Sequence, residues 1–244
     1  MKPQSLFATE AELCAAFISW TARESASGRS PGWTTYAETA GWDILLVAAD
    51  GTQIGIQAKQ RFNMKVLQQA VPGAWEAWRD DGPDYRAILI PTRDNDSANL
   101  CAALGLMLLW PTSTWQGETT FSPGLDMVHH NGGWHWWSPR KRCELPDFIP
   151  DVVAGASGPM QLTKWKVQAL RLVARLEIRG HVTRADFRVL GMDPRRWLGP
   201  QGWLLSDPAR PGEFTRAPGL DFDQQHPTVY AQVLAETRAQ EIVA

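Results

Sequence analysis

A chain of 244 residues, 44% hydrophobic and 20% charged, is long enough for one large domain or two modest ones. No apolar run approaches the roughly 20 residues that a membrane helix needs, and the N-terminus has no apolar signal core, which argues against a membrane or exported protein. Cys14, Cys101 and Cys143 are too widely spaced for a disulfide framework or a zinc site. We therefore expect a cytoplasmic protein with reduced thiols.

The net charge of −2 conceals an uneven distribution. Residues 1–159 hold 12 basic and 17 acidic residues, residues 160–216 hold 11 and 5, and residues 217–244 hold 1 and 4. A basic segment on an otherwise acidic chain indicates a polyanion partner at that segment. Basic helix faces are also often merely solvated, so both interpretations stay open at this point.

Residues 1–110 predict a mixed α/β domain. Thr9 can cap a first helix, and Glu12 completes a T-x-x-E capping box. A Gly/Ser/Pro-rich loop then leads to three strand-like runs, at 33–38, 42–48 and 52–59. The antiparallel meander of three strands after one helix is the first half of the predicted fold.

A second helical stretch follows at residues 63–80, and Pro72 should kink or divide it. Residues 85–91 read as a buried strand, and a short helix and one more strand complete the domain. The element order is therefore helix, three strands, helix, strand, helix, strand, which predicts a mixed sheet with one crossover after the meander.

Residues 111–159 show no clear period and are rich in Gly, Pro and Trp, so we expect a long structured loop and linker. It is either a substrate-contacting insertion or a packing strap. His129, His130 and His135 could ligate a metal, but no cysteine or carboxylate completes a known spacing, which favours surface loop histidines.

Residues 160–218 predict a second domain of three helices and a two-stranded hairpin. An amphipathic helix begins near Leu162 and ends at Gly180, and Thr183 caps a second, short helix. Asp193 with a following proline opens a third helix. This order resembles a winged helix-turn-helix. Residues 219–244 are expected to be a C-terminal tail.

The apolar pattern fixes how the strands around Asp50-Gly51 pair. A two-residue turn would place Ile44 opposite Gln57, which mixes apolar and polar side chains on one face. A three-residue loop, with its glycine in a left-handed bulge, instead places Ile44 opposite Ile56 and continues one apolar face. We therefore predict the three-residue loop.

In that register Asp43 is opposite Gln57, and Lys59 is diagonally adjacent. Such a set suits phosphodiester hydrolysis, in which a divalent ion neutralises developing charge and activates water. Mg²⁺ prefers hard oxygen ligands, and Mn²⁺ is a plausible substitute. The candidate ligands are Asp43, Glu38, the amide oxygen of Gln57 and the carbonyl of Ala58. Lys59 would orient the water or stabilise the transition state.

Asp43, thirteen intervening residues and then Gln57-Ala58-Lys59 on the next strand resemble the D…(D/E)xK signature of PD-(D/E)XK nucleases. The resemblance implies a restriction-endonuclease-like αβββαβ core over residues 9–91, or to 110 with the last helix and strand. It also implies that Asp43 and Gln57 bind metal and that Lys59 is catalytic. Glutamine replaces the usual acid at position 57, as it does in Mrr-type restriction enzymes.

The same resemblance implies accessory residues on the two flanking helices. The family often adds a glutamate from the first helix, for which Glu10 and Glu12 are candidates, although the capping box gives Glu12 a structural role. A polar residue on the helix after the lysine would be Gln68 or Gln69, although solvated glutamines are also common there.

The second domain is a candidate DNA-binding unit. Two adjacent arginines on its third helix could read guanine edges, although many winged helices dock a partner protein instead. The basic residues that could hold phosphates are Lys164, Lys166, Arg184, Arg188, Arg195 and Arg196.

The leading interpretation is a Mg²⁺-dependent DNA endonuclease from a restriction, repair or mobile-element context. The domain order is similar to that of the TnsA transposon-end nucleases, by analogy only. The alternative is a non-catalytic DNA-binding or partner-docking protein on a decayed nuclease core. RNA or structured DNA would suit the same chemistry, and cutting both strands of a duplex would favour a homodimer.

Overall fold

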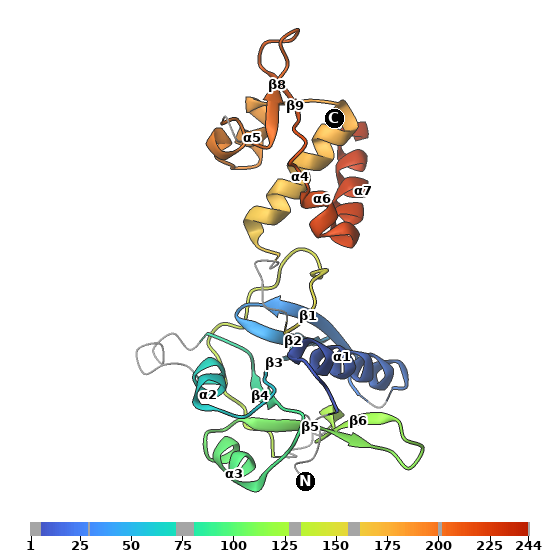
Figure 1. Ribbon diagram of the computed structural model, residues 1–244, viewed down its shortest axis with the longest axis vertical. Coiled ribbons are helices and arrows are strands. Elements are labelled where there is room, and N and C mark those ends of the chain that lie inside the picture. The colour runs from blue at the N-terminus through green and yellow to red at the C-terminus, as the bar shows by residue number, and fades with distance from the viewer. Residues whose placement is uncertain are drawn as a thin grey trace. The chain divides into compact units, whose positions relative to one another are not determined.

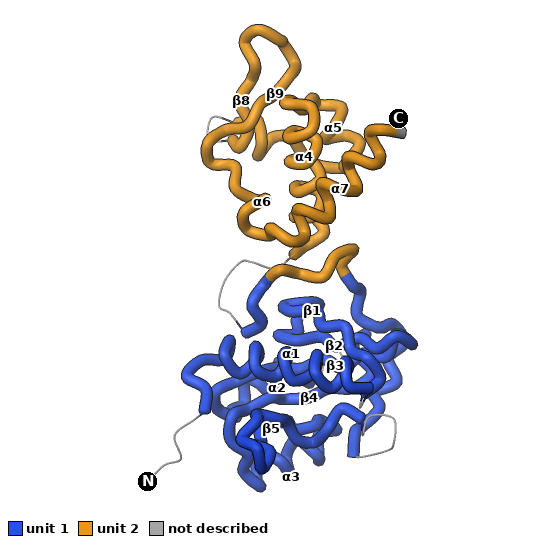
Figure 2. The backbone as a smooth tube through the Cα atoms, turned by 90° about the vertical axis from the view of Figure 1, so that its right-hand side faces the viewer, with its two compact units in different colours: residues 1–145, 152–159 blue, residues 146–151, 160–244 orange. Residues whose placement is uncertain are grey.

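The computed structural model describes residues 6–28, 30–71, 81–126, 133–155, 162–199 and 202–243. The chain forms two compact units, coloured separately in Figure 2. The first comprises residues 1–145 and 152–159, and the second comprises residues 146–151 and 160–244. No helix among the described residues is long and apolar enough to cross a bilayer.

The first unit is a mixed α/β structure built on a six-stranded sheet (Figure 1). Its strands follow chain order across the sheet, and only the β3–β4 and β4–β5 pairs are parallel. The mixed α/β class predicted from the sequence is confirmed at this level. The strands are β1 (Trp33–Thr39), β2 (Trp42–Ala48), β3 (Gln53–Ala58), β4 (Tyr85–Leu89), β5 (Met107–Ser113) and β6 (Thr119–Ser122).

Helices cover both faces of this sheet. The helix α1 (Glu10–Ala26) packs Phe17 into a core with alternate side chains of β2 and β3. The helices α2 (Met64–Ala70) and α3 (Asn95–Ala103) pack on the opposite face, where they lie in one cluster with Leu45 and Ile88. Each of these two helices lies in a crossover between parallel strands, as parallel pairing requires. The predicted kink at Pro72 lies outside the described residues.

The β2–β3 hairpin has the predicted register. Ile44 pairs with Ile56 and Leu46 pairs with Ile54. The Gly51 φ of 83° is the left-handed conformation that a three-residue hairpin loop requires. The apolar pattern alone therefore predicted the pairing that places Asp43 at the end of the hairpin.

Residues 111–159 are more ordered than the predicted loop and linker. The strand β5 continues to Ser113, and β6 pairs with it as a sixth strand. Trp134 and Ala154 are buried in the core of the first unit, whereas Phe148 is buried in that of the second. The missing period has a simple cause, because single buried residues separated by irregular chain leave no periodic signal. This makes much of the segment part of the two cores.

Of the three histidines in that segment, His129 and His130 lie outside the described residues. His135 packs edge-on against Trp137, with 5.4 Å between ring centroids. Among the described residues, no group of three or more His, Cys, Asp or Glu side chains is arranged to hold a metal ion.

The second unit begins with α4 (Lys164–Arg179), which Thr163 caps and which ends at Gly180 with a φ of 76°. The short strands form a sheet in the order β7-β9-β8, with β8 and β9 as the predicted antiparallel hairpin. The remaining elements up to that hairpin are β7 (Val182–Thr183), α5 (Arg184–Val189), a 3₁₀ turn (Pro194–Arg196), β8 (Leu204–Ser206) and β9 (Glu213–Arg216).

Two features of this unit differ from the predictions. The expected third helix is only a 3₁₀ turn, after which the Trp197 side chain is fully buried. Residues 219–244 are not a free tail but form α6 (Phe222–Gln225) and α7 (Pro227–Val243). The side chains of Val229 and Val233 complete the core beside α4. Apolar residues at positions 229, 230, 233 and 234 follow helical spacing, so the predicted tail was wrong.

A buried carboxylate joins α4 to α5. Asp186 accepts hydrogen bonds from the backbone and hydroxyl of Thr183 and from the guanidinium groups of Arg175 and Arg179. Burial acts to raise the pKa of Asp186, but these four donors bring it below its usual range. The carboxylate is therefore a charged centre that holds the start of α5 against α4.

We expect Asp186→Asn to lower the free energy of unfolding by about 3 kcal/mol, because two guanidinium groups lose their shared anion. Since the folded pKa is depressed, the wild-type contribution is present above the unfolded value of about 4 and disappears as the pH falls below it. Urea unfolding at neutral and acidic pH measures both effects. Equal stability of the two proteins at neutral pH would contradict this role.

Candidate active site

Asp43 stands where the β2–β3 ladder ends. The backbone pairing stops at Ile44 with Ile56, and beyond it the Asp43 Oδ2 accepts a hydrogen bond of 2.7 Å from the Ala58 amide. The carboxylate thus takes the place of the next backbone acceptor. This bond holds the Asp43 carboxylate next to Ala58, the residue that immediately precedes Lys59.

Lys59 reaches the first turn of α1. Its Nζ lies 2.7 Å from the Glu10 Oε2, with side chains 20% and 29% exposed. Burial acts to lower the pKa of Lys59, but its hydrogen bond to Glu10 and the charges of Glu10 and Asp43 raise it overall. The ammonium is therefore charged at neutral pH, and Glu10 is the first-helix glutamate that joins the site.

Glu38 approaches the same place from β1. Its backbone has a φ of 48°, and its Oε1 accepts a hydrogen bond of 2.8 Å from the amide of Gly155. Burial, and then the charge of Asp43, raises the pKa of Glu38, although the Gly155 amide and Lys59 act in the opposite direction. Residues 38 and 155 are 117 positions apart, so no local pattern in the sequence indicates this contact.

The charged groups surround one buried thiol. Burial raises the pKa of Cys14, and the neighbouring Asp43, Glu38 and Glu10 carboxylates raise it further, while Lys59 opposes them. Gly155, whose amide binds Glu38, also lies against the Cys14 sulfur and the Glu10 backbone, so Glu38 and Glu10 approach this thiol from two sides. The pKa of Asp43 is also raised, first by burial and then by Glu10, against the effects of the Ala58 amide and Lys59.

The other candidates lie elsewhere. Gln57 is only 1% exposed, and its Nε2 donates a hydrogen bond of 2.6 Å to the carbonyl of Gly41. In the described part of the chain, no hydrogen bond joins its side chain to Asp43 or Lys59. Gln68 and Gln69 are exposed on α2 and line a cavity on that face of the sheet.

Glu12 is used at the start of α1. Its backbone amide donates to the Thr9 hydroxyl at 3.1 Å, and its Oε2 accepts from the Ala8 amide at 2.7 Å. This arrangement is close to the predicted capping box, shifted by one residue on the carboxylate side. The cap therefore accounts for Glu12, whereas Glu10 faces Lys59.

No family model, curated protein or solved structure matches this chain. The interpretation of the site therefore depends on its own residues and their geometry.

The side chains at this site offer carboxylate oxygens, which are the type of ligand that a hard divalent ion prefers. Asp43, Glu38 and Glu10 each have one carboxylate oxygen in a described hydrogen bond, which leaves the other oxygen of each for a ligand. Mg²⁺ typically takes one or two carboxylates and fills the remaining positions with water and substrate oxygens. That requirement is compatible with the lack of any three-residue ligand group among the described residues.

The basic candidates of the second unit are mostly at its surface. Arg184 and Arg188 are exposed on α5, Arg196 is also exposed, and the Arg195 side chain is 91% exposed. Lys164 is exposed at the start of α4. Lys166 is half-buried, and this burial lowers its pKa.

We expect the Cys14 thiol to be unreactive in the folded protein, because burial and three nearby carboxylates disfavour its thiolate. Alkylation with iodoacetamide at mildly alkaline pH, followed by mass spectrometry, should label Cys14 only after unfolding. Labelling of Cys14 in the native protein as fast as in the unfolded chain would contradict the described surroundings of the thiol.

Proposed function

We propose that this protein is a metal-dependent endonuclease of the PD-(D/E)XK kind that hydrolyses phosphodiester bonds of DNA. The observation that carries the proposal is the convergence of Asp43 and Lys59 at the end of one hairpin, with Glu10 and Glu38 beside them. Supporting it is the order of one helix, three antiparallel strands, a helix and a parallel strand around that hairpin.

Each residue has a distinct role in this proposal. Asp43 and Glu38 would hold Mg²⁺ or Mn²⁺, together with the carbonyl of Ala58. A bound ion supplies an activated water and neutralises charge on the phosphate. Lys59 would hold its ammonium against the scissile phosphate, where the negative charge grows in the transition state. Glu10 would orient Lys59 through their ion pair.

The second unit would bind the DNA backbone. Two helices and a 3₁₀ turn followed by a β-hairpin are compatible with a winged helix. Exposed guanidinium groups on α5 and the following turn are those of Arg184, Arg188, Arg195 and Arg196. The turn at Pro194–Arg196 is only three residues long, so it offers little surface for reading bases. We therefore propose contacts that depend mainly on phosphate charge.

A second candidate function is a DNA-binding or partner-docking protein without cleavage activity. Gln57 favours it, because the residue lacks the usual negative charge and its amide is bound to Gly41. The ion pair of Lys59 with Glu10 would then be purely structural. The two functions differ in whether the chain breaks phosphodiester bonds at all.

The test is incubation of the full chain with supercoiled plasmid, linear duplex, single-stranded DNA and RNA, each with Mg²⁺, Mn²⁺ or EDTA. The proposed function predicts scission of a DNA substrate with either ion and none with EDTA. Binding of DNA without scission of any substrate would establish the second candidate instead. Scission of RNA alone would correct the substrate class.

We expect the double substitution Arg195→Ala with Arg196→Ala to weaken binding of duplex DNA and to make it less dependent on salt. Each lost phosphate contact should reduce the slope of log affinity against log salt by about 1. Fluorescence anisotropy with labelled duplexes measures both quantities, and Arg238→Ala on α7 is the control. An unchanged slope in the double variant would place the DNA contacts elsewhere.

A further inference from the structure

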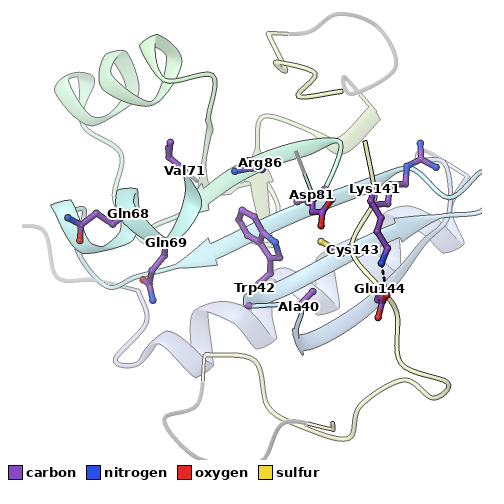
Figure 3. A pocket seen from close by; sticks show the side chains of 14 residues that line it. Ala40, Trp42, Gln68, Gln69, Val71, Asp81, Arg86, Lys141, Cys143 and Glu144 are labelled. Carbon is purple, nitrogen blue, oxygen red and sulfur yellow. Dashed lines mark hydrogen bonds and ion pairs between the residues drawn. The ribbon is translucent and has the colours of Figure 1, made fainter. Parts of the chain in front are cut away.

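A cavity of about 480 Å³ lies on the α2 face of the first unit's sheet (Figure 3). Its size falls in the range of small-molecule sites in proteins, roughly 300–1,000 Å³. It is bounded by the β1–β2 turn with Trp42, by α2 with Gln68 and Gln69, and by residues 81–86 and 141–144. None of the charged groups around Cys14 lines it.

A buried guanidinium forms part of its wall. Arg86 on β4 is 7% exposed, and its Cζ lies 4.3 Å from the ring centroid of Trp137 and 5.9 Å from that of Trp42. Its Nη1 donates a hydrogen bond of 3.2 Å to the carbonyl of Ala70. Its Nε is buried and, within the described residues, has no hydrogen-bond partner.

The neighbouring charges do not neutralise Arg86. Arg142 pairs with the buried Asp84 at 2.8 Å, and Lys141 pairs with Glu144 at 2.6 Å, as Figure 3 shows for the second pair. The Glu144 carboxylate, and after it the charge of Asp81, raises the pKa of Lys141. Within the described ranges, no carboxylate forms a salt bridge with Arg86.

Among the described residues, the one ionisable group that acts on the Arg86 charge is a thiol that stays neutral. Burial raises the pKa of Cys143 to about 11, despite the opposing effects of the Arg86 charge and a hydrogen bond from Trp42. Cys143 is therefore protonated at neutral pH and supplies no negative charge. Arg86 remains a desolvated cation that two indole rings hold in place.

A guanidinium without an anion is unfavourable in such surroundings, because it has lost much of its hydration without gaining a counter-charge. Since arginine does not deprotonate in proteins, an added oxyanion is the way to compensate it. Arginine binds phosphate and carboxylate oxygens through short, charge-assisted hydrogen bonds. Arg86 therefore selects for an oxyanion in the cavity.

The rest of the cavity is too large and too varied for an oxyanion alone. Trp42 lines the cavity but is only 7% exposed, so a nucleobase can contact the exposed part of its indole rather than cover the whole ring. Gln68 and Gln69 are exposed and carry amides that can pair with the donors and acceptors of a base edge. These features belong together in a ligand that has both a phosphate and a heteroaromatic ring.

We propose that this cavity binds a nucleoside 5′-monophosphate group, with the phosphate at Arg86 and the base between Trp42 and α2. The group is either a free nucleotide or the 5′ end of a nucleic-acid strand. The proposal does not depend on cleavage at Asp43 and Lys59, because binding at Arg86 needs neither residue nor a metal.

The experiment is isothermal titration calorimetry of the full chain in EDTA, which separates it from cleavage. The titrants are inorganic phosphate, a nucleoside, a nucleoside 5′-monophosphate, and one oligonucleotide with either a 5′-phosphate or a 5′-hydroxyl. We expect the monophosphate to bind at a single site at least tenfold more tightly than phosphate or nucleoside. Preference for the 5′-phosphorylated oligonucleotide over the free nucleotide would identify a strand end as the source.

Variants locate the binding. Arg86→Lys should weaken binding of the monophosphate at least tenfold. Gln69→Ala should weaken that binding severalfold, and position 69 is exposed, so the fold does not need its side chain. Lys65→Ala is the matched control, because Lys65 is exposed on α2 but does not line the cavity. No saturable binding of the monophosphate would overturn the proposal. Equal binding of inorganic phosphate, or unchanged binding by both variants, would overturn it as well.

Discussion

Asp43→Asn should lower the rate of DNA nicking by about a thousandfold, which corresponds to about 4 kcal/mol of transition-state stabilisation. The substitution keeps the size of the side chain and one oxygen that can accept the hydrogen bond from Ala58. It removes the negative charge that would hold the metal. The loss should therefore appear in metal affinity as well as in rate, as measured by titration with Mn²⁺.

The control for Asp43→Asn is Asp96→Asn, which removes an equivalent charge from the exposed first turn of α3. This variant should cleave like the wild type. Because the pKa of Asp43 is raised, this carboxylate gains its proton at a higher pH than an ordinary aspartate does. As the pH falls, wild-type nicking should therefore begin to decline at that higher pH. Full activity of Asp43→Asn would mean that this residue is not a metal ligand.

Lys59→Met should reduce nicking by about a hundredfold to a thousandfold while leaving metal affinity nearly unchanged. The ammonium would stabilise charge in the transition state rather than hold the ion, so the two measurements should separate. Because the pKa of Lys59 is raised, the size of the loss should be the same between about pH 7 and pH 9.

A second substitution distinguishes chemistry from structure at Lys59. Glu10→Gln removes the carboxylate partner of Lys59 but keeps a hydrogen-bond acceptor at the same place. It should lower the rate about tenfold, because the ammonium stays in the site with less precise orientation. If Lys59→Met lost only stability, seen as a lower urea midpoint with an unchanged rate, the ion pair would be structural.

The sequence predicted the part of the site that local patterns control. Alternating apolar residues in two adjacent strands permit only one pairing that keeps Ile44 and Ile56 on the same face. Gly51 provides the left-handed residue that this pairing requires. Together they predict Asp43 opposite Gln57, but in the structure the Asp43 carboxylate accepts a hydrogen bond from the amide of Ala58 and the Gln57 side chain is bound to Gly41.

What the sequence could not predict depends on contacts between distant parts of the chain. Glu10 and Glu12 differ by about 200° around a helix, so choosing between them requires knowing which face of α1 meets Lys59. The sequence left Glu10 and Glu12 both open, with Glu12 as a possible accessory residue; in the structure Glu12 is used in the cap and Glu10 pairs with Lys59. Glu38 meets Gly155 across 117 residues of chain, which no periodicity encodes.

The same limit explains the errors in the second unit. Residues 219–244 carry a net negative charge, so a tail was predicted. Val229 and Val233 nevertheless suffice to bind α7 to α4, since α4 presents a long apolar face. The third helix ends early, because Trp197 turns into the core immediately after Pro194–Arg196.

Nuclease activity at Asp43 and Lys59 is tested most directly by nicking of supercoiled plasmid with Mg²⁺. The wild type, Asp43→Asn and Lys59→Met are compared, and DNA binding is measured on the same preparations. The proposed nuclease function predicts that all three proteins bind DNA and that only the wild type nicks it at an appreciable rate. Metal-dependent nicking by all three at the same rate would contradict the assigned site. DNA binding by all three without nicking by the wild type would contradict the nuclease itself.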